Sequence, residues 1–149
     1  MAFRLYKGPN GSTGAPGAER FIASGAVTEG IPVKLVAGAS GASLAKVATV
    51  AAGSSSSDPV YGIPIHSAAD GEEVLVIPAL PGMVWEVDAA VDANVSNAAA
   101  DNYLAASTYL LTVGASTNLG KKCHIIGISG KASDRKYLVH INQSAVSGV

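Results

Sequence analysis

The chain has 149 residues, a formal net charge of −1, 48% hydrophobic residues and only 14% charged residues. This length fits a single domain, and no stretch reaches the ~18–20 consecutive apolar residues that a membrane-spanning helix needs. Globular proteins average about 25% charged residues, so a surface this poor in charge favours a homo-oligomer in which other subunits cover part of it.

The N-terminal residues 1–18 are predicted to form a flexible arm ahead of a single β domain over residues 19–149. Residues 8–18 contain four Gly and two Pro, a composition that favours flexibility over packing. Residues 2–6 have the pattern of a short strand. The tip of the arm combines apolar and basic side chains, which favours docking on a partner over a merely disordered terminus. The candidate partner-binding residues are Phe3, Arg4, Leu5, Tyr6 and Lys7.

Short runs rich in β-branched residues follow, separated by turns rich in Gly and Pro. They predict short strands within residues 21–36, on either side of a tight turn at Glu29 and Gly30, and further strands at residues 44–50 and 60–66. Residues 51–59 form a loop. Gly62 and Pro64 interrupt the last run, which indicates an edge strand or a bulge.

Residues 72–95 carry the clearest pattern in the chain, two strand-like runs that flank a Pro-containing turn at residues 78–82. Met83, Trp85 and Val87 fall on one face of the second run. We therefore expect a two-strand unit with Trp85, the only tryptophan, buried at its centre and the other strands packed around it.

The second half of the chain continues the alternation of strands and turns. Residues 92–107 contain an Ala run that favours helix, but their Asn and Asp residues favour turns, so we expect one short helical turn. The remaining predicted strands are residues 109–113, 123–128 and 136–141. Short strands divided by Gly-rich turns indicate an all-β fold, a small barrel or sandwich of antiparallel strands.

The order of these features resembles that of the small head-decoration proteins, or capsid cement proteins, of tailed bacteriophages. The resemblance covers roughly residues 21–142. The segments that carry it are AVTEGIPV (26–33), VYGIP (60–64), ADGE (69–72), MVWEV (83–87), DANV (92–95) and LVHIN (138–142).

This resemblance implies a β-barrel subunit, usually trimeric, on the outer face of an icosahedral shell. Such proteins bind the major capsid protein and stabilise the shell against internal DNA pressure by bridging capsomers. They carry no catalytic residues, and an N-terminal arm fits their habit of gripping neighbouring subunits. The expected location is the capsid surface of the virion, after synthesis in the host cytoplasm.

Charge is segregated along the chain. Residues 58–113 contain eight acidic residues and no Lys or Arg, whereas residues 114–149 contain five basic residues and one acidic residue. Such segregation permits complementary pairing, and the sequence leaves open whether the pairs form within the fold or between copies. Nucleic-acid binding is not expected, because the acidic segment would repel phosphate and only Tyr137 adds an aromatic ring to the basic segment.

Enzymatic activity is not expected. Residues 54–57, four serines, supply the residue types of a hydrolase triad together with Asp58 and His66, but they lie in a low-complexity loop without a Gly-x-Ser-x-Gly elbow. Residues 114–122 resemble a P-loop only superficially. Their spacing is one residue too long, and no Ser or Thr follows the lysine to bind magnesium.

Metals, cofactors and membranes are not expected as partners either. His66, His124 and His140 lack the close sequence spacing of metal ligands, so we expect solvated or core-edge side chains. Cys123, the only cysteine, excludes an internal disulfide and is expected to be a buried structural thiol in a reducing compartment. No apolar signal segment follows residues 1–7, which predicts a soluble protein made in the cytoplasm.

Two other functions remain open. One is a carbohydrate-binding β module, and the other is a different structural component of a virion, such as a tail or fibre protein. A sugar-binding module needs exposed aromatic rings over a groove, for which the chain offers Trp85 and a few tyrosines. The exposure of Trp85 therefore distinguishes the first alternative from a structural role.

Overall fold

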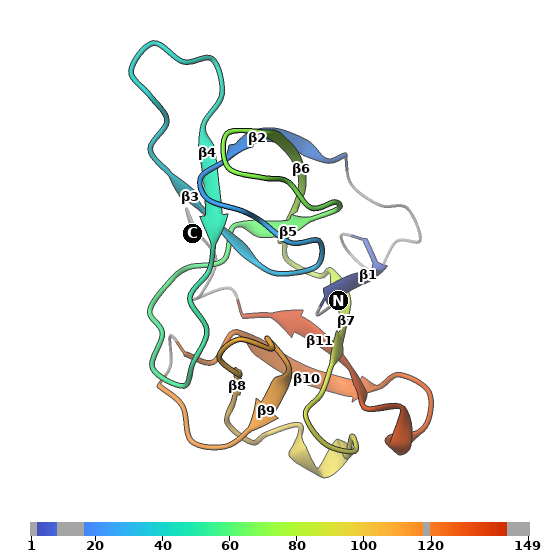
Figure 1. Cartoon of the computed structure of the whole chain (residues 1–149). Helices are drawn as coiled ribbons and strands as arrows, with labels where there is room; N and C mark the ends of the chain where they lie inside the picture. The colour runs from blue at the N-terminus through green and yellow to red at the C-terminus, as the bar shows by residue number, and fades with distance from the viewer. Residues whose placement is uncertain (1–2, 9–16, 118–119, 143–149) are drawn as a thin grey trace.

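The computed structural model describes residues 3–8, 17–117 and 120–142 (Figure 1). Within these ranges the chain forms eleven β-strands and two short 3₁₀ turns, with no α-helix among them. The predicted all-β fold of short strands is therefore confirmed, and it includes a closed barrel.

The elements follow one another along the chain as follows: β1 Phe3–Lys7, β2 Glu19–Ala23, β3 Val33–Val36, β4 Lys46–Thr49, β5 Gly62–Pro64, β6 Glu73–Pro78, β7 Val84–Asp88, η2 Val95–Asn97, β8 Asn102–Leu104, β9 Leu111–Val113, β10 Cys123–Ile128, η3 Ala132–Asp134 and β11 Lys136–Ile141.

Five strands close into a barrel in the order β2-β4-β3-β5-β6, which occupies the upper half of Figure 1. The β2–β4 pair is parallel and the other neighbouring pairs are antiparallel. The barrel interior is filled mostly by the small side chains of Val and Ala. Its buried residues are Phe21, Ala23, Val27, Val33, Val47, Ala68, Val74 and Val76.

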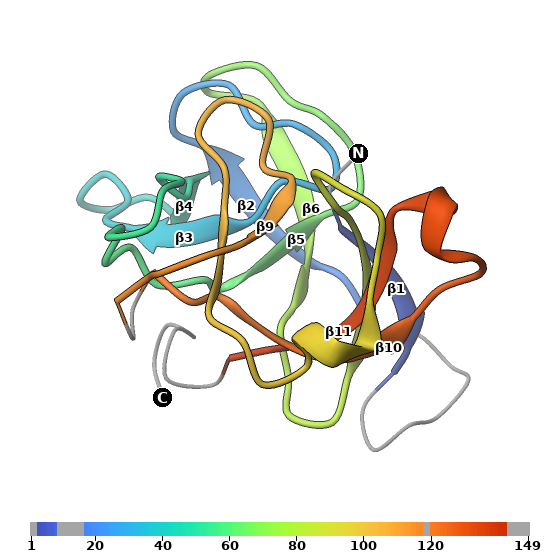
Figure 2. The same cartoon turned by 90° about the horizontal axis from the view of Figure 1, so that it is seen from below.

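Four strands form an open sheet in the order β1-β7-β11-β10, below the barrel in Figure 1 and nearer the viewer in Figure 2. Trp85 on β7 lies opposite Leu5 of β1 and Val139 of β11. Its side chain is only 1% exposed, so its predicted place in the core is confirmed. The strands β8 and β9 form a separate two-stranded sheet, which the bridge between Ala89 and Leu111 ties to the end of β7.

The bounds predicted for β10 and β11 are confirmed, and η2 is the single helical turn expected in residues 92–107. The two-strand unit predicted for residues 72–95 is wrong, because β6 belongs to the barrel and β7 to the open sheet. The turn between them has Pro81 and then Gly82 at its centre. Gly82 has φ 81°, and the amide of Met83 donates to the carbonyl of Leu80 at 3.3 Å, the pattern of a type II turn. This turn directs the chain from one sheet into the other.

For residues 60–66 the edge position, one of the two predicted alternatives beside a bulge, is wrong, because β5 lies between β3 and β6 inside the closed barrel. The carbonyl of Pro64 accepts from the amide of Gly30 at 3.1 Å, so it points toward the 28–31 turn. The nitrogen of a strand residue points to the same side as its carbonyl. The proline nitrogen, which has no hydrogen to donate, therefore faces the turn, and no hydrogen bond to β6 is lost. Gly62 has a packing role, since a Cβ at this position would overlap the carbonyl oxygen of Ile77.

The flexible arm predicted over residues 1–18 does not hold for residues 3–7. They form β1, which pairs antiparallel with β7 and contributes Phe3 to the core at 2% exposure. Residues 9–16, which led to the prediction of flexibility, lie outside the described residues. The predicted short strand at the N-terminus is therefore confirmed, but it is part of the sheet.

Candidate binding surface at the N-terminal strand

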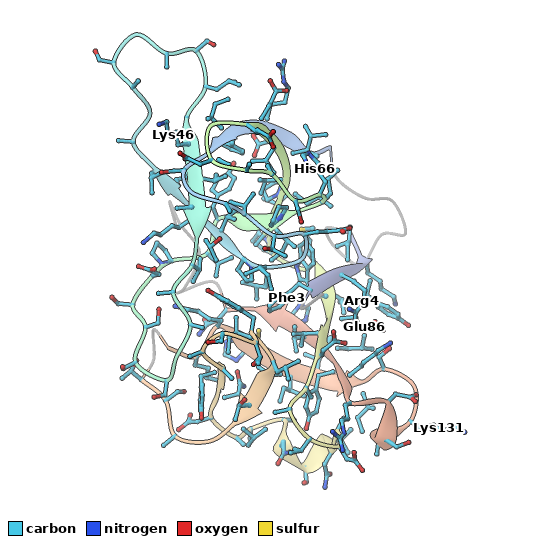
Figure 3. The ribbon with its side chains drawn as sticks, in the orientation of Figure 1. Phe3, Arg4, Lys46, His66, Glu86 and Lys131 are labelled. Atoms are coloured by element: carbon cyan, nitrogen blue, oxygen red, sulfur yellow. The ribbon has the colours of Figure 1, made fainter. Side chains whose placement is uncertain are left out.

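The strand β1 is held on both of its edges. Its residues pair with β7 on one side, and on the other side the amide of Phe3 donates to the carbonyl of Gly30 at 2.9 Å. Successive side chains of a strand point to opposite faces, so Phe3 and Leu5 point into the core while Arg4 points outward. Figure 3 shows Arg4 beside Glu86 of the neighbouring strand, with Phe3 on the other side of β1.

Arg4 joins the outer faces of β1 and β7 through two carboxylates. Its Nε lies 2.8 Å from Glu86 Oε1 and its Nη2 lies 2.8 Å from Asp88 Oδ1. The hydrogen bonds to Asp88, together with those to Glu86, raise the pKa of the Arg4 guanidinium despite its partial burial. Ser129 of the β10–β11 turn also donates to Glu86. The charged cluster therefore ties together three segments that are far apart in sequence.

Of the five predicted partner-binding residues, the structure places two inside internal contacts. Phe3 is buried, and Arg4 is engaged with its two carboxylates. Tyr6 is 53% exposed and Lys7 is also exposed at the end of the strand. Phe3 and Arg4 therefore do not belong to a free arm. A role in partner binding stays a prediction for all five residues, including Leu5.

A cavity of about 250 Å³ lies beside β1, between the sheet and the barrel. Its lining is mostly apolar and includes Leu5, Ile63, Ile65, Ile77 and Trp85. Ile65 is 42% exposed at its mouth. Such a cavity can accept an apolar side chain of a partner. The cavity and the exposed residues Tyr6 and Lys7, which follow Leu5 on β1 but do not line it, form the candidate binding surface.

The residues of the considered hydrolase triad are used in separate structural contacts. Asp58 accepts from the amide of Ala51 at 2.8 Å and pairs with Lys34 at 3.0 Å. The Ala51 hydrogen bond and then the Lys34 ammonium hold the pKa of Asp58 below its ordinary value despite partial burial. His66 lies between β5 and β6, where its Nε2 accepts from the amide of Leu75 at 3.1 Å. The structure therefore does not bring these side chains together.

Cys123 is fully buried, as predicted, and burial raises the pKa of its thiol to about 12. The adjacent Lys122 is 3% exposed, and burial lowers its pKa. The Lys122 ammonium donates to the carbonyls of Ser56 at 3.1 Å and Asp58 at 2.5 Å, which anchors the 51–59 loop. Residues 121–122 lead into strand β10, so the P-loop arrangement, in which a helix follows the lysine, is absent.

The segregated charges pair within one chain. Several acidic residues of the 58–113 segment pair with basic residues from outside it, as in the pairs Arg20–Glu73 at 2.7 Å and Arg135–Asp92 at 3.0 Å. The pairs Arg4–Glu86 and Lys34–Asp58 follow the same rule. Pairing inside the fold, one of the two alternatives from the sequence, therefore occurs, but Arg135 is the only residue of the basic 114–149 segment in these pairs. Pairing between copies stays open for the other charges.

Sequence spacing gave no sign that two of the histidines are neighbours. His124 and His140 lie directly opposite each other on β10 and β11. In the described part of the chain, no three His, Cys, Asp or Glu side chains gather closely enough to hold a metal ion. No helix there is long and apolar enough to cross a membrane.

Comparison with known proteins finds a similar fold among solved structures. No family model matches the sequence, and no curated protein matches it. Among solved structures, the chain is similar to the N base of the head fibre protein gp8.5 of bacteriophage phi29. The similarity has a TM-score of 0.53 at 12% sequence identity, and it covers 87% of this chain and 97% of that chain. At this identity the likeness establishes a shared fold over most of both chains.

Proposed function

We propose that this chain is a structural protein of a tailed-phage virion that binds the outer surface of the head. One observation carries the proposal: its fold is shared with the base of a phage head fibre over 87% of the chain. The sequence resemblance to head-decoration proteins supports the same location from a different starting point. The finer proposal is that the chain bridges capsomers of the major capsid protein and stabilises the shell against internal pressure.

The polar residues of the chain support a mechanical role. Asp58, His66 and Lys122, which have the side-chain types used in catalysis, are each engaged in contacts that hold strands or loops in place. Such an arrangement favours a rigid body that resists load over a site that moves protons or transfers groups.

The carbohydrate-binding alternative loses its main support. A sugar-binding platform needs an exposed ring, whereas the indole of Trp85 is 1% exposed in the centre of the sheet. Tyr6 is an exposed aromatic residue on β1, but it does not line the apolar cavity, whose two aromatic residues, Phe3 and Trp85, are buried. The surface at β1 therefore suits apolar protein contacts better than sugar stacking.

We further propose a homo-oligomer, most simply a trimer. The low charge content supports this, because exposed apolar side chains are scattered over a surface with few charges. The large hydrophobic residues at the surface of the described residues are Tyr6, Leu35, Ile65, Leu80, Val91, Val95 and Ile126. Light scattering of the purified chain at micromolar concentrations is expected to give the mass of three chains. A stable monomer that also remains monomeric on the shell would contradict the trimer.

The test of the function is reconstitution on heads that lack the protein. The purified chain is mixed with such heads, and bound protein is measured by co-sedimentation and located by cryo-electron microscopy. We expect saturable binding at symmetry-related positions on the outer face, and heads that retain DNA at higher temperature once they are coated. A chain that does not co-sediment with heads, and that is absent from purified virions, would overturn the proposal.

A further inference from the structure

The outer face of the open sheet carries a pair of histidines at its β10 edge. His124 and His140 are Cα partners across the antiparallel strands β10 and β11. Residues directly opposite in such a pair have Cβ atoms about 4.5–5.5 Å apart and project to the same face. Both imidazole rings therefore project from neighbouring positions on the same face of the sheet.

One ring is already oriented as metal-binding histidines are. His140 Nδ1 lies 3.0 Å from the carbonyl oxygen of Met83. Because a carbonyl only accepts, this contact places the hydrogen on Nδ1 and leaves the lone pair of Nε2 for a ligand. Metal-ligating histidines commonly donate their other ring nitrogen to a backbone carbonyl in this way. The type II turn at Pro81 and Gly82 holds the carbonyl in position.

The space around the pair suits a hydrated ion. A cavity of about 300 Å³ is lined by both rings, by Asn142 and by the 80–83 turn. His124 is exposed, so the cavity is reached from solvent. The nearby ammonium of Lys122, which would repel a cation, donates instead to two carbonyls of the 51–59 loop, and that loop does not line the cavity.

We propose that His124 and His140 form a binding site for a transition-metal ion of the Zn²⁺, Ni²⁺ and Cu²⁺ class. Imidazole nitrogen suits these ions, whereas Mg²⁺ and Ca²⁺ prefer oxygen ligands. Cys123 adds no ligand, because its side chain is fully buried on the opposite face of the strand. No third His, Cys, Asp or Glu joins the pair within the described residues, so water fills the remaining positions and the ion exchanges readily. This site is independent of the proposed role on the phage head.

Calorimetric titration of the full chain, without a polyhistidine tag, with ZnCl₂ tests the site. We expect saturable binding of one ion per chain and none of MgCl₂. His124→Asn and His140→Asn should each weaken Zn²⁺ binding about tenfold or more. Losing even an outer-shell partner of a metal ligand typically weakens binding by about that factor, and these variants lose a ligand itself. A thermal melt checks that each variant folds. If His140→Asn does not fold, His124→Asn decides, because its ring is exposed.

Nuclear magnetic resonance supplies the matched control within one molecule. On addition of Zn²⁺ the imidazole signals of His124 and His140 should shift while those of His66 stay in place, because His66 Nε2 is already occupied by the Leu75 amide. Three results would each overturn the proposal: no saturable Zn²⁺ binding by the wild-type chain, unchanged binding after both substitutions, or shifts confined to His66.

Discussion

The cores of the barrel and of the open sheet consist of different kinds of side chain. The barrel core consists mainly of Val and Ala, with Phe21 as its largest buried residue. The core of the sheet half contains Phe3, Met83, Trp85 and Tyr137, each at most 2% exposed. The barrel is closed and has no unpaired strand edge, whereas the sheet ends at β1 on one side and at β10 on the other.

This contrast indicates that the barrel provides rigidity and that the sheet provides surface for interaction. A closed barrel with small side chains brings backbones close together, and its strands satisfy each other's hydrogen bonds. The sheet relies on large side chains that come from distant segments, and each of its edge strands exposes one large apolar residue, Tyr6 on β1 and Ile126 on β10. We therefore expect partners to bind at the edges of the sheet, including the cavity beside β1 that Ile63, Ile65 and Ile77 of the barrel half also line.

The largest effect is expected from removing the edge strand β1. Deletion of residues 1–7 eliminates the β1–β7 ladder, the ring of Phe3 and the ion pairs of Arg4. Loss of the Phe3 ring alone, in Phe3→Ala, should lower the free energy of unfolding by about 3–5 kcal/mol. Because domains of this size are stable by only about 5–15 kcal/mol, the deletion should lower the melting temperature strongly or unfold the sheet.

Tyr6→Ala is the control for that deletion, since its ring is 53% exposed on the same strand. We expect its free energy of unfolding to stay within about 0.5 kcal/mol of wild type. A truncated chain that melts at the wild-type temperature would show that β1 is dispensable and would restore the free arm predicted from the sequence.

Substitutions in the two cores should differ in size. Trp85→Ala in the sheet half should lower the free energy of unfolding by about 3–5 kcal/mol, because it removes a large ring that is 1% exposed. Val74→Ala in the barrel removes two methyl groups and should lower it by about 2 kcal/mol. Urea unfolding followed by far-ultraviolet circular dichroism measures both variants, since the signal does not depend on Trp85. Equal effects would contradict the contrast between the two cores.

Overpacking tests the close approach of strands in the barrel. In Gly62→Ala the new methyl group would meet the carbonyl of Ile77 and a methyl of Val76. We expect a loss of about 1–3 kcal/mol in the free energy of unfolding, measured by urea denaturation. Gly127→Ala on β10 is the matched control, because a Cβ there meets only the Leu138 side chain at 3.9 Å, an ordinary contact. If the two variants are equally stable, the barrel is more compliant than its packing indicates.

Strands β10 and β11, in which apolar and polar residues alternate in the local sequence, were predicted correctly. In β10 and β11 the buried positions alternate, with Cys123 and Ile125 on one strand and Tyr137, Val139 and Ile141 on the other. The local sequence therefore contains both the bounds and the orientation of each strand. In contrast, β8 follows an Ala run with flanking Asn and Asp, and its pairing with β9 overrides that local preference.

Features that depend on long-range pairing could not be predicted. Arg4 and Glu86 are 82 positions apart, so the local sequence of residues 3–7 does not indicate which strand pairs with β1. The opposition of His124 and His140 depends on the register of β10 against β11, which shifts between Ile125 and Gly127. A slip of one residue would move one ring to the other face of the sheet, so spacing in the sequence cannot reveal the pair.

The smallest effect concerns two Arg–Glu pairs, one in each half. Burial alone would raise the pKa of Glu86, but hydrogen bonds from Ser129 and Arg4 outweigh it and hold this pKa below its ordinary value of 4.5. The unfolded chain therefore takes up this proton at higher pH than the folded chain does. The resulting stabilisation is fully present above the unfolded pKa and is lost as the pH falls through the folded pKa. It should amount to about 0.2–1 kcal/mol, so wild type should lose slightly more stability below pH 4.5 than Glu86→Gln.

In the barrel, Glu73→Gln provides the comparison. The Arg20–Glu73 pair has a similarly short contact, 2.7 Å against 2.8 Å for Arg4–Glu86, and the hydrogen bond from Arg20 lowers the pKa of Glu73. Its side chains are 61% and 47% exposed, however, against 29% and 19% for Arg4 and Glu86. Water and salt screen the exposed pair more strongly. Urea unfolding of both variants at neutral and acidic pH, with and without added salt, should show that salt removes the effect at Glu73 before the effect at Glu86. An equal response of the two pairs to salt would mean that the sheet holds its charges no more tightly than the barrel.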